Sequence, residues 1–320
     1  MNARFQLAAL TLGAAIMPAA TGIAQGQQPA PAAPYTVVET GRGFERLQDA
    51  INAIGEGKGT IQFASYRFAD CAVQTAGDVT YRAAEPGQAV FDSVTCEGKA
   101  ALVLRGNSAR IEGLVFTGMK VPDGNGAGIR LEKGNLNVSQ SWFRDSQQGI
   151  LTGYDEASAI VVDKSTFTRL GTCENEAGCA HSIYVGYYGS LTVTRSRFEQ
   201  GRGGHYVKSR AMRVAVLDSS FDDSGGRETN YMIDLPAGAT GRIAGNWFVQ
   251  GQSKENYSAF IAVAAEQRNY PSDGLTIEGN DARFAPGVSR ESTFVGDWSG
   301  ERLIISNNRL AEGIKRSDRR

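Results

Sequence analysis

The residue types best suited to acid–base chemistry or anion binding recur in one stretch of the chain, residues 181–236. The stretch holds the only two histidines of the protein, His181 and His205. It also holds a set of polar side chains that follow the histidines at similar spacing: Tyr184, Lys208, Arg210, Asn230 and Asp234. Residues about one repeat apart in sequence can share a site only if the chain winds into a coil whose turns stack.

A repeat of the required length runs through the chain. An aliphatic residue is followed three positions later by Ser or Asn and five positions later by Phe, as in Val138, Ser141 and Phe143. Further copies end at Phe167, Phe198, Phe221 and Phe248, and looser ones begin at Ile111, Ile277 and Ile305. Short β-type runs and a period in the twenties predict a parallel β-solenoid. Its Phe residues are expected to form an internal column, and its Ser and Asn side chains to hydrogen-bond the bends.

Apolar residues at helical spacing in 44–54 predict a helix that caps the N-terminal end of the solenoid. We expect the solenoid domain to span residues 35–312 and the polar tail, 313–320, to be disordered. Before the domain, residues 1–24 have the positive start, short apolar run and small–x–small ending of a signal peptide. Residues 25–34 resemble a flexible lead-in. These features predict a periplasmic or secreted protein without a membrane span in its mature form.

The four cysteines agree with export to an oxidising compartment. Their spacing favours the pairs Cys71–Cys96 and Cys173–Cys179, although other pairings stay open, and a zinc site does not fit the spacing well. The net charge of −1 excludes a general nucleic-acid binder. We expect a monomer whose partner, if acidic, is bound by a local cluster of cations.

The repeat, the capping helix and the segment 59–63 (Gly-Thr-Ile-Gln-Phe) together resemble the right-handed parallel β-helix proteins of the pectate-lyase-like superfamily. The resemblance covers about residues 35–310. The motifs at 181–186, 204–211 and 233–236 are also similar to those of a group of exported bacterial β-helix proteins. The resemblance implies an all-β, single-stranded right-handed parallel β-helix. It also implies the processing of glycans, since this fold carries many glycan-processing sites.

Alignment of the turns predicts which side chains point outward. In the strand before each Phe, one aliphatic residue is expected to face the core: Ile129, Ile150, Ile183 and Val207. By strand alternation their neighbours face solvent, which places Arg130, Tyr184 and Lys208 on one outer face. Arg210 shares this face. Asp234 and Asn230 join it if Ile233, rather than Met232, is the inward residue, while His181 and His205 lie at strand entries where alternation is ambiguous.

Two cations beside a tyrosine suit β-elimination from a uronic-acid polysaccharide. Arg210 is expected to bind the carboxylate and Lys208 to remove the C5 proton, while Tyr184 or His205 protonates the leaving oxygen, with His181 nearby. Related β-helix lyases use Lys/Arg pairs, some of them with calcium. The surrounding side chains are expected to bind the substrate: Arg130, Asn230 and Asp234 by polar contacts, and Tyr154, Tyr187 and Tyr188 by stacking on sugar rings.

Several alternatives stay open at this point. A C5-epimerase requires the same proton abstraction, and a glycoside hydrolase requires paired carboxylates. Asp222 and Asp223 superficially resemble one polygalacturonase motif, but the order of the motifs along this chain differs and the Asn-Thr-Asp motif is missing. A glycan-binding or structural solenoid requires no catalysis, and the histidines of such a protein would form an internal ladder. Calcium is an open cofactor, although Asp234 and Glu228 are too few acidic ligands to form a cage.

Overall fold

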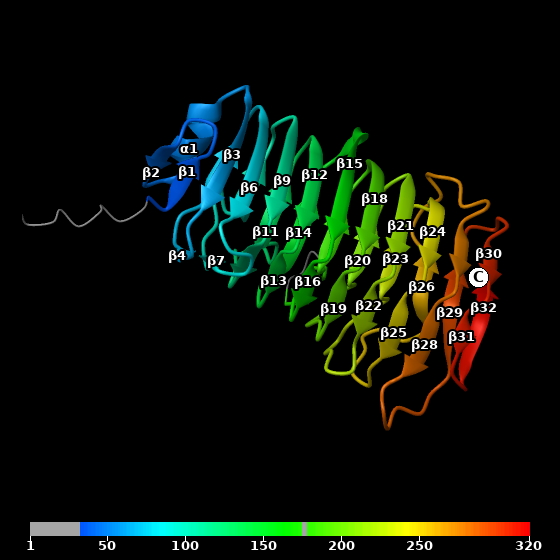
Figure 1. Ribbon diagram of the computed structural model, residues 1–320. Helices are drawn as coiled ribbons and strands as arrows, with labels where there is room; N and C mark the ends of the chain where they lie inside the picture. Colours follow the sequence, from blue (N-terminus) through cyan, green and yellow to red (C-terminus); the bar gives the residue numbers. More distant parts are fainter. Residues whose placement is uncertain (1–32, 175–177) are drawn as a thin grey trace, which may run out of the picture. The chain divides into compact units, whose positions relative to one another are not determined.

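Short runs of alternating apolar and polar residues each form one side of a turn, and successive turns stack along the coil (Figure 1). The computed structural model describes residues 33–174 and 178–320. The predicted signal peptide, 1–24, and all but the end of the lead-in, 25–34, lie outside the described residues. The described residues belong to one compact unit. Among them, no helix is both long and apolar enough to cross a membrane.

Within these residues the strands form three sheets, A, B and C, of twelve, ten and ten strands. Sheet A contains β2 (Arg42–Phe44), β1 (Tyr35–Val37), β3 (Lys58–Phe63), β6 (Asp78–Ala83), β9 (Ser108–Glu112), β12 (Asn135–Ser139), β15 (Asp155–Asp163), β18 (Tyr188–Thr194), β21 (Arg213–Leu217), β24 (Thr240–Ala244), β27 (Thr276–Glu278) and β30 (Ile304–Ser306). Sheet B contains β4 (Tyr66–Phe68), β7 (Ala89–Asp92), β10 (Leu114–Thr117), β13 (Trp142–Arg144), β16 (Thr166–Thr168), β19 (Arg197–Glu199), β22 (Ser220–Asp222), β25 (Trp247–Gln250), β28 (Asp281–Phe284) and β31 (Arg309–Leu310). Sheet C contains β5 (Ala72–Gln74), β8 (Ala100–Leu104), β11 (Ala127–Leu131), β14 (Gln148–Thr152), β17 (Ile183–Val185), β20 (Val207–Ser209), β23 (Ile233–Leu235), β26 (Ala259–Val263), β29 (Ser292–Asp297) and β32 (Ile314–Arg319). All pairings except those of β1 are parallel, which confirms the predicted solenoid.

The recurring phenylalanines form the predicted internal column. From Phe91 to Phe248 the rings stack with centroids 4.8–5.3 Å apart and interplanar angles of 3–14°. This distance matches the spacing of neighbouring strands, because each ring lies on the next turn of sheet B. Burial of these rings supplies a large part of the apolar area that one turn cannot bury alone.

The recurring Ser and Asn residues confirm the second prediction from the repeat. Ser141 Oγ donates to the backbone of its own bend, 2.9 Å from Ser139 O, and the backbone N–H of Ser141 donates to Ser165 Oγ in the next turn. Further along, Asn246 Nδ2 donates to Asn280 Oδ1 at 3.0 Å and to Val216 O at 2.8 Å. These side chains satisfy buried backbone groups at each bend between sheets A and B.

A single described helix, α1 (Leu47–Ile54), stands at the N-terminal end of the coil and packs against β1, β2, β3 and β5 (Figure 1). It buries Leu47, Ala50 and Ile51, which fits the predicted cap. The helix begins later than the prediction of residue 44, because Phe44 belongs to β2. The backbone N–H of Leu47 donates to the Asp70 carboxylate at 2.9 Å, which supplies the capping acceptor from a different segment.

The prediction of a disordered tail at 313–320 is wrong. Residues 314–319 form β32, which pairs in parallel with β29 and extends sheet C. Ile314 is buried, and Arg319 Nε lies 3.7 Å from the Asp297 carboxylate. A polar composition suggested disorder, but backbone pairing requires no particular side chains, and the charges face outward from an edge strand.

Both predicted disulfides are present. Cys71 pairs with Cys96, whose positions are 25 residues apart, and Cys173 pairs with Cys179. The first links the loops before β5 and β8 on neighbouring turns, and the second closes a loop before β17.

The internal column leads to a stability prediction. Phe167→Ala removes a fully buried ring between two stacked neighbours and is expected to lower the free energy of unfolding by about 3–5 kcal/mol. Urea unfolding followed by circular dichroism would measure the loss. Phe167→Leu, which keeps most of the volume, should cost clearly less, and equal costs for both variants would contradict a packed column.

Candidate functional site

Three of the predicted site residues lie in neighbouring strands of sheet C. Strands β17, β20 and β23 align Tyr184 with Lys208 and Lys208 with Asp234. The neighbouring row of Ile183, Val207 and Ile233 is fully buried in the core. The predicted choice of Ile233 as the inward partner of Val207 is therefore confirmed, and so is the alternation that puts Tyr184 and Lys208 on the outer face.

Tyr184, Lys208 and Arg210 form one cluster. Arg210 donates a hydrogen bond to Tyr184 Oη, and Lys208 Nζ and the Arg210 guanidinium carbon lie 5.8 and 5.4 Å from the centre of the tyrosine ring. The two cationic side chains are only 12% and 14% exposed, so their charges are partly removed from water. Two cations and a phenol are thus held together in a position where they can bind an anion.

A residue that the sequence did not reveal covers this cluster. Glu266 Oε1 lies 2.6 Å from Lys208 Nζ, and its other oxygen pairs with Arg210. Burial acts to raise the pKa of Glu266, but the contacts with Lys208 and Arg210 outweigh it and lower the pKa. A carboxylate therefore already occupies the place between the two cations in this state.

The loop that carries Glu266 follows β26. Its backbone is held against the bend after β23, where the N–H groups of Glu266 and Gln267 donate to Pro236 O at 3.1 and 2.8 Å. Tyr187 Oη donates to Gln267 at 2.7 Å. The only sequence signal for this loop is its length, since twelve residues separate β26 from β27 whereas four separate β23 from β24.

Asp234 lies beneath the cluster and is only 2% exposed. Its Oδ2 is 3.5 Å from Lys208 Nζ and 3.4 Å from His205 Nε2, whereas Oδ1 is buried and has no hydrogen-bond partner within the described part of the chain. Burial raises the pKa of Asp234 to about 6, against the opposing effect of Lys208. The prediction that Asp234 contacts the substrate is therefore wrong, because the strand faces outward but loop residues cover it.

The two histidines lie against this outer cluster and are buried. His205 Nδ1 is 3.3 Å from the carbonyl oxygen of Tyr231, which can only accept, so Nδ1 carries the proton and Nε2 presents a lone pair to Asp234. Burial holds the pKa of His205 well below its usual value. The contact between His205 and Asp234 therefore needs the proton of a neutral Asp234 carboxyl group, which agrees with the raised pKa of that group.

His181 accepts the backbone N–H of His205 at Nδ1, at 3.0 Å, so its neutral ring carries the proton on Nε2. Burial, together with Lys208 and Arg210, lowers the pKa of His181 to about 3. Its ring packs edge-on against Tyr184, with centroids 5.2 Å apart. The predicted role of His205 as proton donor to a sugar is wrong, since its ring faces Asp234 and Tyr231. Tyr184 is half-buried and lies nearer the surface than either histidine.

A groove of about 370 Å³ lies beside Tyr184. Its lining includes Lys99, Asp123, Asn125, Arg130, Leu151, Thr152, Tyr154 and Tyr184. The strands align Arg130 with Leu151 and Leu151 with Tyr184, so the groove follows the same outer row that continues to Lys208. Arg130 and Tyr154 thus line the groove that adjoins Tyr184.

The predicted stacking residues divide into two groups. Tyr154 is 73% exposed, and Tyr187 packs against it with ring centroids 5.5 Å apart. Tyr188, in contrast, is fully buried, so its prediction as a sugar platform is wrong. A register irregularity between β15 and β18, next to the pair Asp155–Tyr188, breaks the alternation and turns Tyr188 inward.

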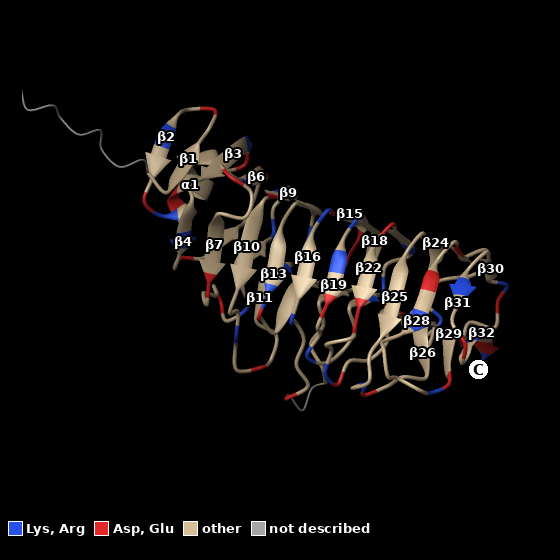
Figure 2. Ribbon diagram, turned by 60° about the horizontal axis from the view of Figure 1, so that its bottom comes forward, with Lys and Arg blue, Asp and Glu red and all other residues tan. Residues whose placement is uncertain are grey.

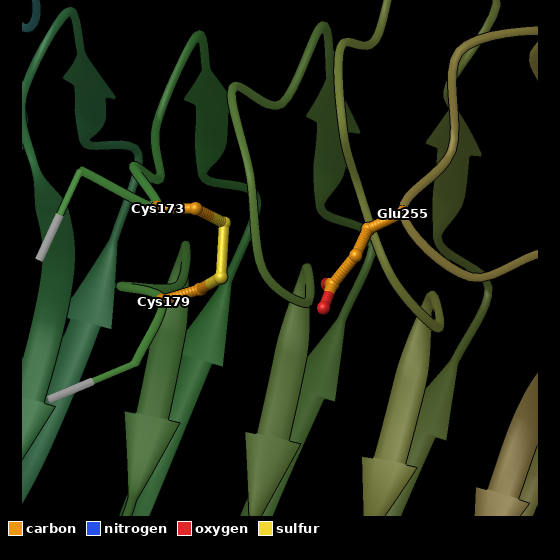
Figure 3. Close-up of side chains that lie close together, drawn as sticks. All are labelled: Cys173, Cys179 and Glu255. Atoms are coloured by element: carbon orange, nitrogen blue, oxygen red, sulfur yellow. A yellow bond between two sulfur atoms is a disulfide. The ribbon is translucent and has the colours of Figure 1, made fainter. Parts of the chain in front are cut away.

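Asn230 and Glu228 do not join the cluster around Lys208. Asn230 Nδ2 donates to Glu255 at 2.8 Å, and Glu228 is exposed. The one group of three potential metal ligands found among the described residues contains Cys173, Cys179 and Glu255 (Figure 3). Because the two sulfur atoms are bonded to each other, this group does not fit a metal ion. The group does not include Asp234 or Glu228, the predicted calcium ligands.

The two neighbouring carboxylates, Asp222 and Asp223, lie in different environments. Asp223 is fully buried, accepts from Tyr206 Oη at 2.7 Å and pairs with the buried Lys254 at 3.2 Å. Asp222 stays nearer the surface on the outer side of β22. A buried, fully paired carboxylate cannot reach a glycosidic bond, so these two residues do not form the acid–base pair of a glycoside hydrolase.

Comparison with solved structures supports the fold. The chain is similar to the pectin methyl esterase of the rice weevil, with a TM-score of 0.50 and 12% identity over 81% of this chain and 80% of the esterase. It is also similar to an alginate lyase of the PL6 family, with a TM-score of 0.44 and 13% identity over 83% of this chain but only 39% of the lyase. No protein-family model and no curated protein sequence matches the chain. At these identities the likeness concerns architecture alone, and the chain is a right-handed parallel β-helix protein.

Proposed function

We propose that the outer face of sheet C binds an acidic, uronic-acid polysaccharide and cleaves it by β-elimination. One observation carries this proposal: Lys208 and Arg210 hold a carboxylate, that of Glu266, directly beside the phenol of Tyr184. A uronate that replaced Glu266 would have its carboxylate neutralised at the same two cations. The fold is compatible with such activity, since polysaccharide-processing enzymes include the pectin methyl esterase that shares it.

The proposed reaction assigns one role each to Arg210, Lys208 and Tyr184. Arg210 binds the substrate carboxylate and stabilises the negative charge that develops on it. Lys208, as the neutral amine, takes the proton from C5, and the C–H electron pair forms the C4–C5 double bond as the C4–O4 bond breaks. Tyr184 donates its proton to the departing O4. Burial raises the pKa of Tyr184 despite the two cations, which keeps the phenol protonated as this step requires.

The proposed function requires Glu266 to leave Lys208 and Arg210 when substrate binds. Lys208 would otherwise stay between two carboxylates, Glu266 and Asp234, and could not act as a base. The loop after β26 is thus a part of the site that must move.

The decisive experiment incubates the protein with a panel of uronic-acid polysaccharides, with and without EDTA, and follows the ultraviolet absorbance of unsaturated ends. Absorbance that grows with time supports β-elimination, and its loss with EDTA would indicate calcium. New reducing ends without absorbance would contradict β-elimination and would show that the protein hydrolyses the glycosidic bond. Altered uronate composition without chain cleavage would indicate a C5-epimerase.

A second candidate is a non-catalytic glycan-binding solenoid. The observation that favours it is the closed state of the cation pair, with Glu266 in ion-pair contact with both Lys208 and Arg210. Tight binding of one polysaccharide, with neither absorbance nor new ends, would support this candidate. It shares the location of the site with the lyase and differs only in the chemistry.

Export of the protein is part of the proposal. Two disulfides fit an extracellular or periplasmic location, where thiols are oxidised and where acidic polysaccharides are accessible. Detection of the protein in a periplasmic or culture fraction, with the chain starting after residue 24, would test this part.

The state of Asp234 predicts a pH dependence of anion binding. The titratable and charged groups that act on Asp234 are His205, Lys208, Arg210 and Glu266. Above the pKa of about 6, Asp234 is ionised and competes for Lys208; below it Asp234 is neutral. Both histidines stay neutral in this range because burial lowers their pKa values. Affinity for an acidic oligosaccharide should therefore rise about tenfold as the pH falls through 6, since a charge within several Å is removed.

Asp234→Asn keeps the shape of the side chain but cannot ionise. Calorimetric titration should show that this variant binds the acidic oligosaccharide tightly both above and below pH 6, without the tenfold change in affinity. Asp218→Asn, a change at a bend away from the site, is the control and should show the same pH dependence as the original protein. If the step persists in Asp234→Asn, another group causes it and the assignment is wrong.

A further inference from the structure

The groove beside Tyr184 contains a cation that the proposed reaction does not use. We infer that this groove is a second carboxylate-binding subsite. In it, Arg130 binds a uronate of the same polysaccharide, about three sugar residues away from the uronate that Lys208 and Arg210 hold. The inference rests on the proposed function and deepens it. It specifies that the site binds two charged sugars and that the glycan lies along the axis of the coil.

The contacts of Arg130 differ from those of the cations around it. Lys99 and Arg105 share the carboxylates of Glu97 and Glu132 through close ion pairs. Arg130 reaches Glu132 only at 4.0 Å, and its Nε is buried without a hydrogen-bond partner among the described residues. The Arg130 side chain is 27% exposed and lines the groove, so its guanidinium is suited to a carboxylate from outside the protein.

The spacing between the two cationic sites follows from the strand register. Arg130, Leu151, Tyr184 and Lys208 are partners on the four consecutive strands β11, β14, β17 and β20. Three inter-strand steps separate Arg130 from Lys208 by about 14 Å. A pyranose residue in a polysaccharide advances by roughly one such step, so a chain laid along the coil axis would present one carboxylate at each end of this distance, about three residues apart.

The walls of the groove fit sugar rings between these two points. Tyr184 lines the groove on one side and contacts Arg210 on the other, so the groove leads directly to the cluster. Tyr154, which is 73% exposed, also lines the groove. Gly186 permits this arrangement, because a Cβ at that position would come within 2.7 Å of the Tyr154 ring and 2.2 Å of Gly153 O. Aromatic faces at this point can stack on the sugars that connect the two carboxylates.

Charge alone does not mark the groove, since residues of both signs are spread along the outside of the coil (Figure 2). What distinguishes Arg130 is that it lines the groove and has no close carboxylate partner among the described residues. The distinction also provides a matched control. Arg110, on the outer side of β9 in sheet A, likewise lies far from its nearest carboxylate, 3.9 Å from Glu112, but is more exposed and lines none of the groove.

The test measures binding of uronate oligomers as a function of their length. Oligomers of galacturonate and of mannuronate, from two to eight residues, are titrated into the full chain by calorimetry. For the original protein, affinity should increase about ten- to a hundredfold once the oligomer is long enough to reach Arg130, the gain of one charge-assisted hydrogen-bonded pair. Arg130→Gln should lose this gain and bind the shortest oligomers as the original does, while Arg110→Gln should behave like the original at every length.

The outcomes separate this inference from the proposed function. A gain with length that survives in Arg130→Gln overturns the second subsite and leaves the proposed function intact. Absence of binding by any oligomer to the original chain overturns both. Tyr154→Ala, which changes an exposed side chain, should reduce the same gain without lowering the melting temperature, and an unchanged gain there would contradict the path of the glycan along the groove.

Discussion

Lys208→Arg is expected to reduce cleavage of a uronic-acid polysaccharide by about 10²–10⁴-fold while substrate binding stays within a few-fold of the original. Arginine keeps the positive charge that pairs with Glu266, Asp234 or a substrate carboxylate, but it cannot lose a proton at accessible pH. If Lys208 only binds the carboxylate, this variant stays active. If Lys208 removes the C5 proton, binding and cleavage separate.

The measurement combines calorimetric binding with the initial rate of absorbance increase on the same preparation. Lys164→Arg, a change at an exposed bend between β15 and β16, is the matched control and should leave both quantities unchanged. A Lys208→Arg variant that cleaves at the original rate would remove Lys208 as the base and leave it as a substrate-binding residue.

Tyr184→Phe is expected to have an effect of similar size for a different reason. The change removes one hydroxyl, the one that Arg210 contacts, and keeps the ring that packs edge-on against His181. Loss of a positioned proton donor costs about 10²–10⁴-fold in rate. The loss should fall on kcat rather than on substrate affinity, because the phenol acts on the leaving oxygen and the carboxylate is held by the two cations.

The departure of a poor leaving group requires a proton from the enzyme, whereas a good leaving group departs without one. Model substrates with increasingly acidic leaving groups should therefore recover activity in Tyr184→Phe. Tyr66→Phe, which removes the hydroxyl of an exposed ring on β4 of sheet B, should retain its activity. Equal losses in both variants, or no recovery with a better leaving group, would show that Tyr184 does not donate the proton.

The repeat in the sequence was sufficient to predict the fold, because it is local and redundant. The pattern of Val138, Ser141 and Phe143 recurs in every central turn. Neighbouring strands with the same pattern bury their apolar residues in only one register, so the pattern determines how they pair. The same rule predicted that Ile183 and Val207 face inward and that Tyr184 and Lys208 stand side by side outside. The location of the candidate site was thus predictable from alternation alone.

The composition of the site was less predictable, because its remaining members come from loops that obey no repeat. Glu266 belongs to a long connection after β26, and nothing in its sequence neighbourhood indicates that it folds back onto Lys208 and Arg210. Asp234 has the outward position that alternation predicts, yet it is buried, since loop residues cover that part of the sheet. The burial of a residue depends on every segment that packs against it, so the sequence of its own strand does not determine it.

The sequence by itself determined the coil, the register of sheet C and the row in which a tyrosine and a lysine meet. Only the tertiary structure decided the chemical states within that row. It set the proton positions of His181 and His205 through a backbone N–H and a backbone carbonyl, and it turned Tyr188 into the core at an irregular strand pairing. Strand pairing follows a short-range pattern that a sequence can repeat, whereas protonation and accessibility depend on the summed contacts of distant loops.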